Sequence, residues 1–386
     1  MTYKLTNRRL ILAARPVGVP QPGHFRRDDQ PVSGMADGEF VIHNRFVSVD
    51  PAQRGWVNAA ANYSDAVPLG EVMRALAVGE VIASFDPNVR VGEHYYGWFG
   101  WQDYCVASAS QLLVKVDPAN GSLSTALGIY GITGITAYLA LTELGRPRAG
   151  DTVLVSTAAG AVGSIVGQLA RRLDCDVVGL TGCDDKVQRC EREFGYRAAL
   201  NYKRGLAAAD LTALCPRGVD IYFDNTSGEI SDAVWPHLNP RARIIQCGTA
   251  AVASWDPVPS APRHDREILT KRLTHQGFII FDHVTRYAEV IATLAAWVRD
   301  RTLAYREDIV DGLDNAPAAL TELYRGENTG KKVIRLLTCG LRPVAVARGD
   351  SADTRSPRRK SSLLATHTAA SPCHGRAHRH PTTHRR

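Results

Sequence analysis

The chain has 386 residues, 45% hydrophobic and 22% charged, a composition that excludes a mostly disordered protein and leaves room for two domains. Its net charge of +7 could indicate a nucleic-acid partner, but residues 341–386 carry ten Lys and Arg residues against two Asp residues. This tail therefore contributes +8, and the rest of the chain has a net charge of −1. The body of the protein thus has no basic stripe that could bind a phosphate backbone. No apolar run reaches the length of a membrane helix or a signal-peptide core, which favours a cytoplasmic protein without a membrane partner.

The cysteines of the chain argue against a metal site. All eight are scattered, without a Cys-x-x-Cys pair or a Cys–His cluster at ligand spacing. We therefore expect no structural zinc, and thiols that stay reduced in the cytoplasm.

Two stretches of the chain share a β-rich character. Residues 1–123 contain short runs such as Glu39-Phe-Val-Ile and Gly79-Glu-Val-Ile-Ala, separated by Pro and Gly turns. Short mixed elements return near the end of the body, so we expect residues 301–338 to rejoin residues 1–123 in one β-rich domain. Residues 341–386 are poor in apolar side chains and are expected to form a disordered basic tail.

The pattern of residues 124–300 is different, because short apolar runs alternate with longer amphipathic segments. The runs are predicted strands at Val153-Leu-Val-Ser, Val177-Val-Gly-Leu, Ile221-Tyr-Phe and Ile244-Ile-Gln-Cys. The amphipathic segments are predicted helices at 162–173, 186–194, 229–238 and 284–299. Such alternation builds a parallel sheet with crossover helices, so we assign the chain to the α/β class, with a Rossmann-type doubly wound parallel sheet.

The first of these strands leads into a glycine-rich turn, Ala158-Ala-Gly-Ala-Val-Gly163, and then into a helix. This is the pattern of a dinucleotide-binding fingerprint with Ala158 in place of the first glycine. Gly160 would let the backbone approach a pyrophosphate, Gly163 would let helix and strand pack closely, and the helix N-terminus would supply free amides. A simple turn is the alternative, but the strand–turn–helix setting favours a nucleotide site.

The kind of dinucleotide depends on the end of the second strand, about 20 residues further on, where NAD-binding versions carry an acidic residue. Here Lys186 lies just beyond that strand, and its charge would attract a 2′-phosphate, so NADPH is favoured over NADH. Asp184 and Asp185 precede it and can be explained as residues that cap the helix. From spacing alone, Lys186 could equally be a solvated helix residue.

Several further motifs follow the glycine-rich turn in a fixed order: Asn201-Tyr-Lys, Tyr222-Phe-Asp-Asn, Cys247-Gly, Gly277-Phe and Gly326-Glu-Asn-Thr-Gly-Lys. With Ser48-Val-Asp-Pro-Ala-Gln-Arg-Gly55 in the first domain, they resemble the zinc-independent medium-chain reductases, in particular the group of prostaglandin reductase, leukotriene hydroxydehydrogenase and alkenal or curcumin double-bond reductases. The resemblance runs from about residue 5 to Leu336. It implies a GroES-like catalytic domain, a homodimer, and NADPH-dependent hydride transfer to the β-carbon of an enone or enal.

The resemblance also implies a set of cofactor-binding residues. They are Gly160, Ala161, Val162 and Gly163 at the pyrophosphate, Lys186 and Tyr202 at the 2′-phosphate, and Asn225, Cys247, Gly248, Phe278, Ile279 and Asn328 toward the ribose and nicotinamide. Taken from the residues alone, Asn225 and Asn328 could be turn residues, and Phe278 and Ile279 could be ordinary sheet core.

The catalytic group is harder to assign from the sequence. Hydride transfer to an enone places negative charge on the carbonyl oxygen, which requires a hydrogen-bond donor in a dry site, and the α-carbon must then take a proton. The resemblance implies tyrosines where this chain has Ala52 and Ala253. Tyr63 follows in the loop expected beside the substrate, and we hold it as the candidate catalytic residue. A half-buried packing role is the alternative.

Two other functions stay open at this point. One is a quinone reductase of the neighbouring zinc-free group, which would take quinones instead of enones or enals as its small-molecule substrate. The other is an NADPH-binding sensor without turnover, which the two missing tyrosines would explain.

Overall fold

The computed structural model describes residues 5–337, except 60–61, 253 and 256. The predicted basic tail and Ala253 therefore lie outside the described residues. Within the described chain, no helix is both long and apolar enough to cross a membrane.

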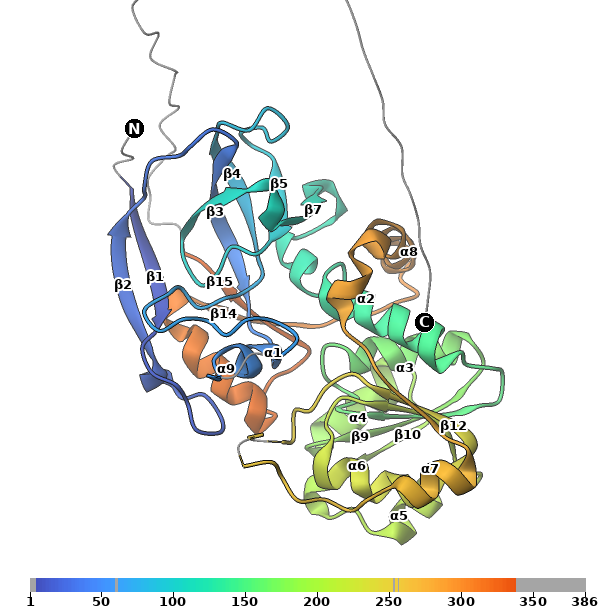
Figure 1. The fold of residues 1–386 in the computed structure, drawn as a ribbon. Helices are drawn as coiled ribbons and strands as arrows, with labels where there is room; N and C mark the ends of the chain where they lie inside the picture. Colours follow the sequence, from blue (N-terminus) through green and yellow to red (C-terminus); the bar gives the residue numbers. More distant parts are fainter. Residues whose placement is uncertain (1–4, 60–61, 253, 256, 338–386) are drawn as a thin grey trace, which may run out of the picture. The chain divides into compact units, whose positions relative to one another are not determined.

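The first part of the chain is built on a seven-stranded sheet (Figure 1). The strand order is β14-β15-β3-β4-β5-β7, with β6 paired to β3, and a separate ribbon of β1 and β2 beside it. The strands are β1 Thr6–Leu12, β2 Phe25–Pro31, β3 Glu39–Ser48, β4 Ala77–Ser84, β5 His94–Gly97, β6 Tyr104–Ser108, β7 Leu112–Val116, β14 Glu307–Asp311 and β15 Lys331–Arg335. Alternating burial along β4 and β6 shows the two-residue period of strands with one face in the core.

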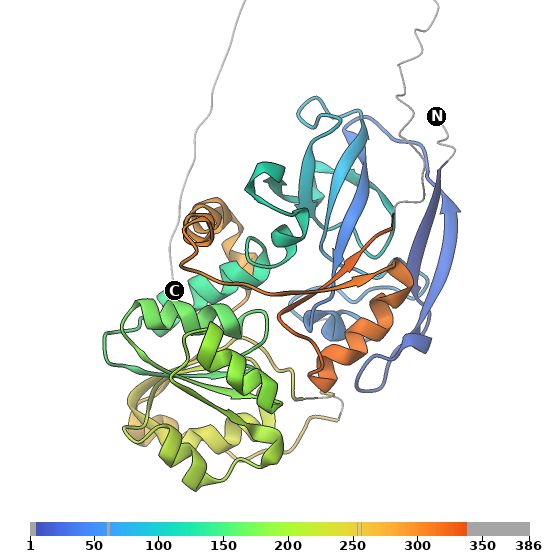
Figure 2. The same cartoon turned by 180° about the vertical axis from the view of Figure 1, so that it is seen from behind.

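The last two strands come from the far end of the chain. β15 pairs antiparallel with β3, and β14 runs parallel to β15. The helix α9 Ala316–Arg325 joins them, and Figure 2 shows this orange segment lying beside the blue N-terminal strands. A short helix, α1 Ala52–Trp56, follows β3 directly.

The second part is a six-stranded, wholly parallel sheet in the order β10-β9-β8-β11-β12-β13, which is the doubly wound Rossmann order. Its strands are β8 Thr152–Ser156, β9 Asp176–Thr181, β10 Ala198–Asn201, β11 Val219–Asp224, β12 Leu238–Gln246 and β13 Thr274–Gly277. The helices are α2 Ile132–Leu139, α3 Gly163–Arg172, α4 Asp184–Glu193, α5 Ala208–Leu214, α6 Gly228–Val234, α7 Asp265–Lys271 and α8 Tyr287–Arg299. The predicted α/β class is confirmed.

Successive side chains of the central strand β8 enter two different cores. Val153 and Val155 pack with residues of α2, α3 and α8, whereas Leu154 packs with residues of α5 and α6. Figure 1 shows α2 and α3 on one side of this sheet and α5 and α6 on the other. Because helices cover both faces, β8 is buried throughout, which explains its uninterrupted apolar run.

Two predicted helices differ from the structure at their ends. The helix predicted over 229–238 stops at Val234 and continues as a 3-10 turn over Trp235–His237, because Pro236 has no amide hydrogen for the helix. The helix predicted over 284–299 begins at Tyr287, after a 3-10 segment Ile280–Arg286.

Candidate active site

The glycine-rich turn lies between β8 and α3, as its sequence predicts. Thr157 adopts a left-handed backbone conformation, φ 49°, and reverses the chain at the end of β8. A methyl group on Gly163 would stand 2.4 Å from the carbonyl oxygen of Thr157, so helix and strand could not pack this closely around any other residue. No described side chain caps α3; the amides of Ser164 and Ile165 donate to the carbonyls of Gly160 and Val162, both at 3.0 Å, so the anion-binding character of this end rests on the turn before Ser164 and on the helix dipole.

The alanine that replaces the first glycine of the fingerprint is accommodated by a glycine on the neighbouring strand. A methyl group on Gly179 of β9 would lie 2.6 Å from the Cβ of Ala158. Below the turn, Tyr196 fills the space left by Gly167 and Gly179, and its hydroxyl donates to the carbonyl of Gly163 at 2.7 Å. Sequence reasoning missed Tyr196, although the two glycines on adjacent elements indicate a large side chain between them.

The segment that carries Asn328 lies against this turn. Gly160 and Gly330 form an isolated parallel bridge, so two motifs 170 positions apart in the numbering meet at the backbone. The Asn328 side chain donates to the carbonyl of Gly330 at 2.9 Å, which fixes the shape of the segment. The structure thus brings Asn328 to the nucleotide turn.

Lysine and aspartate side chains hold that segment to the Asp-Pro motif of the first domain. Lys331 donates to Ser48 Oγ at 2.7 Å and to the carbonyl of Val49 at 3.1 Å, and it forms an ion pair with Asp50. Lys331 and Asp50 are 3% and 4% exposed. This buried pair was not anticipated, because the two residues are far apart in the sequence.

Positive charge gathers at the end of β9, beyond the turn. Lys186 of α4 donates to the carbonyl of Gly326 at 2.7 Å, and Lys203 donates to the carbonyl of Arg325 at 2.9 Å. Burial lowers the pKa of Lys186 from its usual value. Both lysines therefore sit at the C-terminus of α9, whose partial negative charge attracts cations.

Tyr202 lies close to these lysines. A methyl group on Gly182 would be 3.1 Å from the Tyr202 hydroxyl and 3.4 Å from Lys203 Cε. Burial raises the pKa of Tyr202, so it stays a neutral donor. The Asp184 carboxylate accepts hydrogen bonds from the Asn201 side chain, at 3.0 Å, and from Arg204, so both of its oxygens already have a partner.

Asn225 ends β11 and is fixed by its neighbour on β8. Its side chain donates to the carbonyl of Ser156 at 2.7 Å, and its amide donates to Ser156 Oγ at 2.8 Å. The fully buried Asp224 accepts from the amides of Thr226 and Ser227 and from the Ser231 hydroxyl, at 2.8, 2.9 and 2.7 Å. Sequence reasoning did not single out Asp224, which shapes the turn around Asn225.

Cys247 and Gly248 follow β12 and pack against the same turn. Their amides donate to the carbonyl of Asp224 at 2.8 and 3.1 Å. A methyl group on Gly248 would be 2.9 Å from the carbonyl oxygen of Asn225, which explains the glycine. Burial raises the pKa of the Cys247 thiol to about 12, so it is an inert thiol at neutral pH.

Phe278 and Ile279 continue from β13. The amide of Phe278 donates to the carbonyl of Gln246 at 3.1 Å, and the Phe278 ring stacks on His283 with centroids 4.8 Å apart. Phe278 is buried and Ile279 is half-buried. The ends of β8, β11, β12 and β13 therefore meet at the carboxyl edge of the parallel sheet, where ligands bind in open α/β folds.

Tyr63 lies in the loop after α1, and half of its side chain is exposed. Burial of the rest raises the pKa of its hydroxyl, whereas a hydrogen bond with the Trp56 side chain lowers it. Tyr324 of α9 donates its hydroxyl to the carbonyl of Pro51, and its ring carries the Arg54 guanidinium 4.6 Å from the centroid. Arg54 also donates to the carbonyl of Thr249 at 3.0 Å, which joins α1 to the loop after β12.

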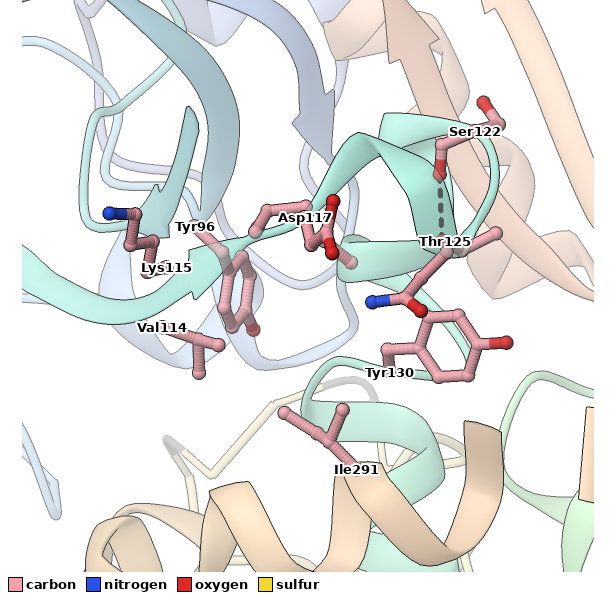
Figure 3. Close-up of a pocket in the computed structure, with 11 residues that line it drawn as sticks. Tyr96, Val114, Lys115, Asp117, Ser122, Thr125, Tyr130 and Ile291 are labelled. Atoms are coloured by element: carbon pink, nitrogen blue, oxygen red, sulfur yellow. Dashed lines mark hydrogen bonds between the residues drawn. The ribbon is translucent and has the colours of Figure 1, made fainter. Parts of the chain in front are cut away.

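A separate small cavity of about 60 Å³ lies between β7, the turns that follow it, and α8 (Figure 3). Tyr96, Val114, Tyr130 and Ile291 are among the residues that line it. It contains none of the predicted site residues and would hold only a few water molecules. We therefore place no substrate there.

Comparison with known proteins agrees with this geometry. Residues 8–116 match the family described as the N-terminal domain of oxidoreductase, and residues 161–296 match the zinc-binding dehydrogenase family. Within the described residues, no three His, Cys, Asp or Glu side chains are grouped as metal ligands. Fold and site thus define an NADP-dependent oxidoreductase of the medium-chain type.

Individual relatives narrow this class. The NADPH-dependent curcumin reductase of Escherichia coli is 38% identical over 86% of this chain and 98% of its own length. The NADP-dependent 2-alkenal reductase of Nicotiana tabacum is 32% identical over 86% and 98%. The structure of CurA from Vibrio vulnificus in complex with NADPH superposes with a TM-score of 0.81 at 36% identity, covering 86% and 99%. The chain belongs to the zinc-independent medium-chain reductase family, in its enone and alkenal reductase group.

Proposed function

We propose that this protein uses NADPH to reduce the carbon–carbon double bond of α,β-unsaturated ketones or aldehydes. The observation that carries the proposal is the bridge between Gly160 and Gly330, which sets the Asn328 segment against an uncapped helix N-terminus in a chain of this family. Bound NADPH would supply the hydride. The protein would bind and orient both molecules and exclude water around the reacting carbons.

The residues that would hold the cofactor follow from the geometry above. The pyrophosphate would lie on the backbone of Gly160, Ala161, Val162 and Gly163, and the 2′-phosphate beside Lys186 and Tyr202. Asn225, Cys247, Gly248, Phe278, Ile279 and Asn328 would line the ribose and nicotinamide. Tyr63 would deliver the proton to the α-carbon.

The proposal extends to the organisation of the protein. Residues 1–123 and 301–338 would form the catalytic domain and residues 124–300 the NADPH-binding domain, since β15 pairs with β3. The edge strand β13 is exposed along its whole length, which favours a homodimer formed across it. A cytoplasmic location would suit a reductase that depends on NADPH.

The test is NADPH oxidation by the purified protein with a panel of enones, enals and quinones. We expect consumption of NADPH with enones and enals, a saturated ketone or aldehyde as the product by mass spectrometry, and much slower oxidation of NADH. Turnover confined to quinones would contradict the proposal. So would tight NADPH binding without turnover of any substrate.

A further inference from the structure

A buried guanidinium on one short helix has a hydrogen-bond donor without a partner. Within the described residues, seven buried side-chain polar atoms have no hydrogen-bond partner. One of them, Arg54 Nη1, lies on the five-residue helix α1, directly after the Asp-Pro motif. An unpaired buried donor is costly, which makes Arg54 Nη1 a candidate to bind an acceptor.

The surroundings of Arg54 leave its charge without an anion. Only 7% of the residue is exposed, and no carboxylate within the described residues pairs with it. Its guanidinium lies over the Tyr324 ring and uses Nη2 for the carbonyl of Thr249 at 3.0 Å, which leaves Nη1 unpaired. A guanidinium group keeps its charge in proteins, and burying that charge without an anion is unfavourable.

Arg54 lies next to the proposed nicotinamide side, where negative charge would develop on the carbonyl oxygen of the substrate. Thr249 comes directly after Cys247 and Gly248, at the carboxyl end of β12, beside the turn of Asn225. Asp50 and Gln53 fix the start of α1, because the Asp50 amide donates to Gln53 Oε1 at 2.9 Å and Asp50 pairs with Lys331. The guanidinium is therefore held rigidly between the Asp-Pro motif and the proposed nicotinamide side.

The neighbouring tyrosines are not suited to donate a hydrogen bond to this oxygen. The Tyr324 hydroxyl is used by the carbonyl of Pro51, and burial raises the pKa of Tyr324. Ala52 carries no donor at all. Tyr63 lies half exposed in its loop and is suited to proton delivery more than to fixed charge stabilisation.

We infer that Arg54 is the hydrogen-bond donor that holds the carbonyl oxygen of the unsaturated substrate as it becomes an enolate oxygen. The inference rests on the proposed function. Bound NADPH would supply the hydride for the new C–H bond at the β-carbon; the electron pair of the C=C bond would then form the new bond between the α-carbon and the carbonyl carbon, and the carbonyl π pair would move onto oxygen. Nη1 donates a hydrogen bond to that oxygen and keeps its proton, and the α-carbon takes its proton from Tyr63 or water.

The experiment uses benzalacetone, a neutral enone, and measures kcat and KM by NADPH oxidation and the Kd of NADPH by fluorescence. Arg54→Ala is expected to lower kcat about 100-fold, as the loss of one oxyanion donor does, while NADPH Kd changes less than about twofold. Added guanidinium ion at millimolar concentration should restore about tenfold of the lost kcat, and tetramethylammonium should not. Arg335→Ala, which removes an exposed ion pair with Asp311, serves as the matched control.

Each outcome decides the matter. If Arg54→Ala does not fold, Arg54→Lys and Arg54→Met are compared, and the lysine variant must keep the higher kcat. An unchanged kcat, or a loss that guanidinium does not restore, overturns the inference and leaves Arg54 a packing residue. A rise in KM confined to the para-carboxylate analogue of benzalacetone also overturns it, since Arg54 then binds a substrate anion. If the wild type does not reduce benzalacetone, it is the proposed function that fails.

Discussion

The two sides of the candidate site are built in opposite ways. On the nucleotide side, glycines allow backbone segments to pack closely, and the Tyr196 hydroxyl donates to the turn at the carbonyl of Gly163. The Asp224 carboxylate accepts several hydrogen bonds from the turn that follows β11. On the proposed substrate side, α1 carries the unpaired buried donor Arg54 Nη1, and Tyr63 is half exposed. The nucleotide side is complete without its ligand, whereas the substrate side still has hydrogen bonds to make.

This difference suggests how the two halves tolerate change. A preformed turn loses binding when its packing is disturbed, because the backbone itself is the ligand. Removing a donor from an incomplete polar site lowers turnover, because the negative charge that the donor stabilises develops only during the reaction. Substitutions on the two sides should therefore separate cofactor affinity from kcat.

The largest effect is expected from Gly163→Ala on the nucleotide side. The added methyl would stand 2.4 Å from the Thr157 carbonyl oxygen and 2.9 Å from Ala158 Cα, both backbone atoms that cannot move away cheaply. We expect a loss of about 3 kcal/mol in the free energy of unfolding in urea and no measurable NADPH binding. Gly23→Ala, where nothing lies within 4 Å, is the control. Normal NADPH affinity in Gly163→Ala would show that the turn is looser than its packing indicates.

Tyr63→Phe addresses the substrate side. If Tyr63 delivers the proton, kcat should fall by about 100-fold, in the range of general acid catalysis, while the Kd of NADPH by fluorescence stays the same. The raised pKa of Tyr63 keeps its hydroxyl protonated at neutral pH. Deprotonation of Tyr63 should therefore cause no loss of wild-type activity at any pH up to about 9. An unaltered kcat in the variant removes Tyr63 from the mechanism.

Lys186→Ala tests the proposed contact with the 2′-phosphate on the nucleotide side. If Lys186 binds the 2′-phosphate, removing this charge-assisted hydrogen bond should cost about 2 kcal/mol, so the Kd of NADPH should rise about thirtyfold and that of NADH should hardly change. Lys186 also bonds to the carbonyl of Gly326, so part of the loss reflects a weaker hold on α9. Titration of both cofactors separates the two effects, since an equal loss for NADH would assign Lys186 to structure alone.

The sequence was sufficient for the features that depend on local pattern. The strand β8, the turn at Gly163 and the helix α3 could be predicted because an apolar run, a glycine and an amphipathic segment follow one another directly. Short polar strands give a weaker signal. β13, Thr-His-Gln-Gly, is an exposed edge strand without an apolar face, so its own pattern does not predict it, and it is held by its pairing with β12.

In the candidate site too, features set by local pattern could be predicted, and features set by packing could not. The residues of the turn could be named from spacing, but Tyr196, Asp224 and the pair of Lys331 with Asp50 could not, because their roles arise from packing between distant segments. Arg54 was passed over within a motif that had already been recognised. The role proposed for Arg54 rests on the buried Nη1 that has no hydrogen-bond partner, and burial is not visible in one sequence.

The smallest predicted effect concerns acid stability, and it lies away from the site in β3. Burial, with the charge of Arg45, lowers the pKa of His43 to about 4, against 6.5 in an unfolded chain. Between these values the unfolded state binds a proton that the folded state does not, so stability falls as the pH drops from 6.5 toward 4. Partial solvent screening limits the loss at pH 5 to about 1 kcal/mol. Urea unfolding of His43→Gln at pH 7 and pH 5 should show a smaller acid loss than the wild type; equal losses would assign the acid sensitivity to other groups.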